Sequence, residues 1–101
     1  MLSKAAIIAL ILNGGMQEPP ARYAHEPPSY ELDIMPDWQL PIMCGKPHGG
    51  KIRVGCAITR RGTGEAFIYI SDIVAGNKRA LAIVLRHEEA HLNGWPSDHG
   101  R

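Results

Sequence analysis

The sequence predicts a small α+β domain in which a short antiparallel sheet packs on a C-terminal helix. The chain has 101 residues, a length that suits one domain. Residues 51–71 contain two strand-like segments joined by a glycine-containing link, which indicates a hairpin. After residue 77 the apolar spacing changes to that of a helix. An apolar segment and a proline-rich stretch precede these elements.

The N-terminal segment "MLSKAAIIALIL" places Lys4 before eight unbroken apolar residues, 5–12. This run is too short to cross a bilayer, which takes about 20 residues. A charge followed by such a run is typical of an export signal. We expect residues 1–15 to be a signal, cleaved or kept as a membrane anchor, and the protein to be periplasmic or secreted. The alternative is an apolar helix packed on the domain of a cytoplasmic protein.

Residues 16–29 are rich in proline, which fixes φ and removes a backbone donor. We therefore expect a linker here and assign residues 30–101 to the folded domain. Residues 30–43 contain enough apolar side chains to pack on a core and could contribute one short strand.

Cys44 and Cys56 are the only cysteines. In a small exported chain such a pair predicts one disulfide. The loop between them contains several glycines and can bend enough to close. A cross-link over a loop of this size stabilises a fold by about 3 kcal/mol. The alternative is a cytosolic protein with two buried thiols.

The predicted hairpin joins residues 51–59, which alternate in polarity, to residues 65–71, which are rich in β-branched and aromatic side chains. The link "RRGTG" has two glycines in five residues. The helix that follows spans about 78–93. Asn77 is a suitable N-cap, Gly94 a suitable C-cap, and Pro96 prevents continuation.

The predicted helix carries His87, Glu88 and His91 as "HEEAH", which is H-E-x-x-H. Residues at i and i+4 share one helix face, so both imidazoles can reach one ion at about 2.0–2.1 Å. Glu88 is offset from that line, where a carboxylate can take a proton from a metal-bound water. Beyond the turn lie Asp98 and His99. We expect His87, His91 and His99 to bind Zn²⁺, with Asp98 as the alternative third ligand.

The stretch "HEEAHLNG" resembles the active-site helix of zincin metallopeptidases, including the H-E-x-x-H-x-x-G extension of metzincin-like members. The resemblance implies an exported zinc-dependent peptidase that acts on peptides or proteins, with Glu88 as general base. It also implies that residues 65–71 form an edge strand that holds extended substrate. The usual slot of the third ligand is Ser97 here, so the turn before His99 must be longer. We expect no Met-turn of the metzincin kind after His99, and a partner chain could complete the cleft.

The charge balance argues against a nucleic-acid partner, because 11 basic and 10 acidic residues give a net charge of +1. Two further hypotheses belong to other classes. One is a non-catalytic module, structural or peptide-binding, that is stabilised by zinc on a zincin-like scaffold. The other is a metal-free protein whose histidines lie on a solvated helix end.

Overall fold

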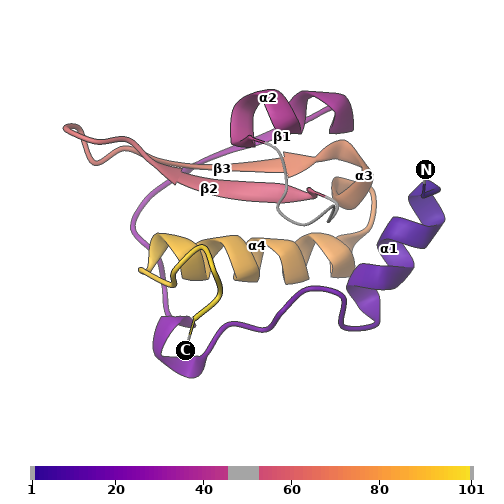
Figure 1. Ribbon diagram of the computed structural model, residues 1–101, viewed down its shortest axis with the longest axis horizontal. Coiled ribbons are helices and arrows are strands. Elements are labelled where there is room, and N and C mark those ends of the chain that lie inside the picture. Colours follow the sequence, from indigo (N-terminus) through magenta and orange to yellow (C-terminus); the bar gives the residue numbers. More distant parts are fainter. Residues whose placement is uncertain (1, 46–52, 101) are drawn as a thin grey trace.

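A three-stranded sheet lies over the C-terminal helix α4 (Lys78–Leu92) in the computed structural model, which describes residues 2–45 and 53–100 (Figure 1). The strands are β1 (Glu31–Met35), β2 (Gly55–Thr59) and β3 (Ala66–Ser71), in the order β1-β3-β2. The α+β class is confirmed. The sheet is mixed, because β1 pairs with β3 in parallel while β2 pairs with it antiparallel.

The predicted hairpin is confirmed as β2 and β3, with residues 60–65 as its link. Gly62 and Gly64 in the link have φ values of 89° and 74°, which favour glycine. Residues 51 and 52 of the first predicted strand lie outside the described residues.

The expectation that residues 65–71 form a free edge strand is wrong, because β3 is the central strand. Residues 31–35 occupy its second edge, with Leu32 opposite Ile68 and Ile34 opposite Ile70. The backbone groups of β3 are therefore used on both sides by its neighbours. The described strands with an open edge are β1 and β2.

Helix α4 begins at its predicted cap, where the Asn77 side chain accepts a hydrogen bond from the Ala80 N–H at 3.0 Å. Its apolar face packs on the sheet through Ala80 and Val84, which are fully buried together with Ile68 and Ile70. The predicted span of 78–93 agrees with the structure to within one residue.

The N-terminal segment forms helix α1 (Lys4–Leu12), which packs beside the start of α4 (Figure 1). Ile7 and Ile11 of α1 are buried members of the main core cluster. The segment thus packs on the domain, and an export signal over residues 1–15 stays a prediction. Across residues 2–45 and 53–100, no helix combines the length and apolarity needed to cross a membrane.

Residues 17–30, here called the strap, run alongside α4 and include a 3₁₀ turn at Ala21–Tyr23 (Figure 1). The region expected to be a linker is therefore bound to the helix. Backbone carbonyls of the strap accept hydrogen bonds from α4 side chains. The contacts are Arg86–Glu18 at 3.0 Å, Asn93 Nδ2 to the carbonyls of Tyr23 and His25 at 2.9 and 2.8 Å, and Tyr30 Oη to Glu89 at 2.6 Å.

On the opposite face of the sheet lies helix α2 (Leu40–Cys44), which follows a 3₁₀ turn at Asp37–Gln39 (Figure 1). The predicted disulfide is confirmed and joins Cys44 of α2 to Cys56 of β2, with Cα atoms 5.9 Å apart. A disulfide suggests an oxidising, extracellular compartment. A short helix α3 (Asp72–Ala75) connects β3 to α4.

Candidate metal centre

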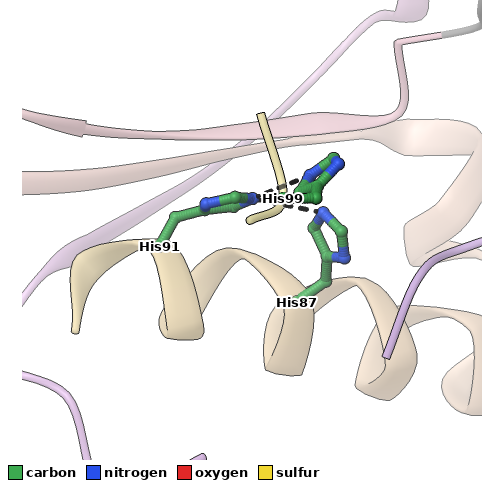
Figure 2. Close-up of side chains that lie close together, drawn as sticks. All are labelled: His87, His91 and His99. Atoms are coloured by element: carbon green, nitrogen blue, oxygen red, sulfur yellow. Dashed lines mark hydrogen bonds between the residues drawn. The ribbon is translucent and has the colours of Figure 1, made fainter. Parts of the chain in front are cut away.

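Three histidines converge where the face of α4 meets the C-terminal tail (Figure 2). His87 and His91 lie one turn apart on α4, and His99 comes from the tail. Nε2 of His91 is 3.3 Å from Nε2 of His87 and 3.2 Å from Nε2 of His99. One nitrogen from each residue lies within 4.8 Å of the others. The cluster could hold a metal ion.

The turn after α4 explains how the tail returns to the helix. Gly94 has a φ of 103°, and its N–H donates to the His91 carbonyl at 3.1 Å. The Trp95 N–H donates to the Ala90 carbonyl, also at 3.1 Å. This pair of bonds is the Schellman motif, in which a left-handed glycine ends the helix and reverses the chain. A second turn, from His99 N–H to the Pro96 carbonyl at 2.9 Å, then brings His99 back.

Of the two candidates for the third ligand, His99 is the one that lies with the helical histidines. Asp98 is exposed, and its Oδ1 accepts a hydrogen bond from the Gly100 N–H at 3.0 Å. The carboxylate therefore closes the local turn and is not part of the cluster.

The outer nitrogens of the helical histidines are bound to backbone carbonyls. Nδ1 of His87 lies 2.8 Å from the Gln17 carbonyl oxygen, and Nδ1 of His91 lies 2.8 Å from that of Trp95. A carbonyl can only accept, so each Nδ1 must carry the proton. Each ring then turns its Nε2 to the centre of the cluster, and Nε2 without a proton is the form that a metal binds.

His87 is held in its neutral form. The residue is 6% exposed, and burial lowers its pKa from 6.5 to about 4, against the opposing effect of the hydrogen bond to Gln17. The charges that His91 and His99 can carry lower the His87 pKa further. At neutral pH this imidazole is therefore available as a ligand without first losing a proton.

Glu88 follows His87 on α4 and is buried, with 5% of its surface exposed. Burial raises the pKa of its carboxyl from 4.5 to about 7, and the positive charge of Arg53 acts in the opposite direction. Arg53 also donates from Nη2 to the Cys44 carbonyl at 3.3 Å. The guanidinium thus connects the disulfide-bearing segment to the surroundings of Glu88.

Sequence reasoning finds the three histidines and Glu88 but misses Gln17, Arg53 and Trp95. Gln17 acts through its backbone carbonyl, which leaves no sequence signal. Trp95 does have one, because a tryptophan between the turn residues Gly94 and Pro96 is unusual for an exposed loop, and this one is 2% exposed.

Comparisons with known proteins return no match: no protein-family model, no curated protein and no solved structure resembles the chain.

Proposed function

We propose that the protein is a zinc-dependent peptidase of minimal zincin type, with His87, His91 and His99 as metal ligands and Glu88 as general base. The observation that carries this proposal is the convergence of three Nε2 atoms, two of them from a helix on which the buried Glu88 directly follows His87. A site of three protein ligands with an open fourth position is the arrangement found in catalytic zinc centres.

The spacing of the nitrogens supports zinc. Two ligands at about 2.0–2.1 Å from one tetrahedral ion lie roughly 3.3 Å from each other. The Nε2 separations of 3.3 and 3.2 Å match this value. Two unprotonated nitrogens at this distance repel each other, and a cation between them removes that repulsion, so the donor set fits a metal ion.

Glu88 has the properties of a base that works near neutral pH. A pKa of about 7 lets its carboxyl accept a proton and return it to a leaving amine with little cost in either direction. Zinc, when bound, polarises a scissile carbonyl and acidifies water in the site. His87 and His91 are held in place by the carbonyls of Gln17 and Trp95, so their lone pairs need no reorientation.

We place an extended peptide substrate along β2. The Arg60 N–H donates to the Glu65 carbonyl, and the Ser71 N–H donates to the Val54 carbonyl. The even-numbered residues of β2 therefore direct their backbone N–H and C=O groups toward β3. In an antiparallel pair the alternate residues then direct their N–H and C=O groups to the open edge. These residues are Gly55, Ala57 and Thr59. Gly55 lies directly against Val84, three residues before His87 on α4, so this edge passes over the site helix.

Replacement of Glu88 by glutamine tests the mechanism. Glu88→Gln should bind one zinc per chain, as measured by elemental analysis of protein purified without a metal-affinity tag. It should lose at least about 100-fold in cleavage of fluorescein-labelled casein or a quenched peptide library, because the proton acceptor is gone. Glu89→Gln is the matched control, since Glu89 bonds to Tyr30 of the strap, and it should keep wild-type activity. Full activity in Glu88→Gln would refute the mechanism.

A second candidate, a zinc-stabilised structural or peptide-binding module, is favoured by the burial of His87 and by the tail that supplies His99 to the cluster. The fourth coordination position separates the two. A water there indicates catalysis, whereas a fourth protein ligand indicates a structural role. X-ray absorption of the zinc-loaded protein measures this. Four protein ligands together with no cleavage of the peptide library would establish the second candidate.

A further inference from the structure

We propose that Trp95 is a positioning residue that fixes His99 against the helical histidines before a metal binds, and so sets the affinity of the site. The inference rests on the metal-binding part of the proposed function and is independent of whether the site cleaves peptides.

Trp95 contacts the helix through its backbone and the tail through its side chain. Its backbone carbonyl accepts the hydrogen bond from His91 Nδ1 at 2.8 Å. Its indole Nε1 donates to the carbonyl of Gly100, the residue after His99, also at 2.8 Å. The indole N–H is the one donor of this side chain, and it is used on the segment that carries the third histidine.

The indole ring also forms a wall against all three imidazoles. It stacks on His91 with ring centres 4.7 Å apart and planes 12° from parallel. Its centre is 5.0 Å from that of His87 and 4.8 Å from that of His99. A ring in this position limits how far each imidazole can rotate away from the common centre.

His99 needs such support because it lies outside regular secondary structure, and its φ of 60° is uncommon for a residue other than glycine. The bond from Gln17 Nε2 to the His99 carbonyl is long, at 3.4 Å. If the tail were free, ordering it would reduce the affinity for the metal. With Trp95 in place, that ordering is completed when the chain folds.

The first test is Trp95→Phe, which keeps an aromatic ring and removes the donor to Gly100. We expect its zinc affinity, measured by competition with a chromophoric chelator, to fall by about 10- to 100-fold, the usual effect of losing a residue that orients a ligand. Trp38→Phe is the matched control, because Trp38 is 70% exposed, and it should bind zinc as the wild type does. Unchanged affinity in Trp95→Phe would refute the proposal.

A double-mutant cycle separates positioning from a general structural role. His99→Ala removes the ligand through which Trp95 is proposed to act. In that background Trp95→Phe should have no further effect on zinc affinity, and the Co²⁺ absorption bands of both His99→Ala proteins should be the same. Losses that simply add would show that Trp95 acts elsewhere and would overturn the proposal.

If Trp95→Phe fails to fold, replacing Trp95 by benzothienylalanine in a ligated chain keeps the shape of the ring and removes only the N–H donor. The same loss of affinity is expected, and wild-type affinity would again refute the proposal. Zinc binding without peptide cleavage would count against the proposed peptidase, but the proposed role of Trp95 would still stand. Absence of zinc binding by the wild-type protein would overturn both.

Discussion

The two nitrogens of each helical histidine have different roles in this site, and the difference depends on single hydrogen bonds. The carbonyls of Gln17 and Trp95 take the Nδ1 protons of His87 and His91. Both Nε2 lone pairs are thereby directed to the same point. A glutamine in place of either histidine could offer a donor or an acceptor at the cluster, but no imidazole nitrogen for a metal.

The buried Glu88 carboxyl should make the metal-free protein sensitive to pH. Its pKa is raised from 4.5 to about 7, so the folded state favours the protonated form. This contribution to stability is complete below about pH 4.5 and is lost as the pH rises through 7. In chelator, Glu88→Gln should therefore gain about 2 kcal/mol over the wild type between pH 5 and pH 8.

Urea unfolding of both proteins at the two pH values measures this difference. Titration of the histidines is common to the pair and cancels in the comparison. A difference between the variants that stays constant from pH 5 to pH 8 would contradict a raised pKa for Glu88.

At the scale of single residues, much of the candidate site can be predicted from the sequence. The spacing of His87 and His91 places them on one helix face, and Gly94 with Pro96 predicts a turn that returns His99. The choice between Asp98 and His99 does not follow, because it depends on the turn from His99 to Pro96. The carbonyl of Gln17 is beyond prediction, since it is 70 residues from His87 in the chain.

Helix α4 serves both the core and the histidine cluster, so its distance from the sheet fixes the position of His87 and His91. Gly55 sets that distance on β2. A Cβ at this position would lie 2.9 Å from the Tyr69 carbonyl oxygen and 3.3 Å from Cγ1 of Val84. The backbone oxygen cannot move aside without disturbing the strand pairing.

Gly55→Ala should therefore destabilise the protein by about 1–3 kcal/mol through overpacking, as measured by urea unfolding. Gly76→Ala is the control. There the nearest atom to an added Cβ is 3.6 Å away and φ is −73°, so this change should be neutral or stabilise by about 0.5 kcal/mol. Equal effects of the two substitutions would show that Gly55 does not determine the packing.

The individual elements were predictable where their signals are local. Alternation predicts β2 and β3, while Asn77 and Gly94 mark the ends of α4. The parallel pairing of β1 with β3 cannot be predicted in this way, because it joins residues 31–35 to residues 67–71 and no short-range pattern encodes that contact. The prediction of a free edge on β3 is wrong because the sequence does not show that residues 31–35 pair there.

On the scale of the whole molecule, the disulfide fastens helix α2 to the sheet on the face opposite α4. Cys44 ends α2 on one side, and Cys56 lies on β2, whose Gly55 contacts α4 on the other. The carbonyl of Cys44 also accepts a hydrogen bond from Arg53, whose charge acts on Glu88.

Replacing both cysteines by serine should lower the free energy of unfolding by about 3 kcal/mol, because the cross-link restricts a short loop in the unfolded chain. Treating the wild-type protein with a phosphine reductant should give the same loss, and the double-serine variant should not respond to that reagent. Urea unfolding with and without reductant measures both. A wild-type protein that is indifferent to reduction would contradict a stabilising disulfide.

The bond between Gln17 and the His99 carbonyl has a consequence for biosynthesis, because it joins positions 82 residues apart. The three-histidine cluster cannot exist until residue 99 has left the ribosome and folded back on the strap. A nascent chain has the two helical histidines but not the third, so it has at most a weak affinity for metal. The three-histidine cluster is therefore completed only after residue 99 has been synthesised, later than the helix that carries its first two members.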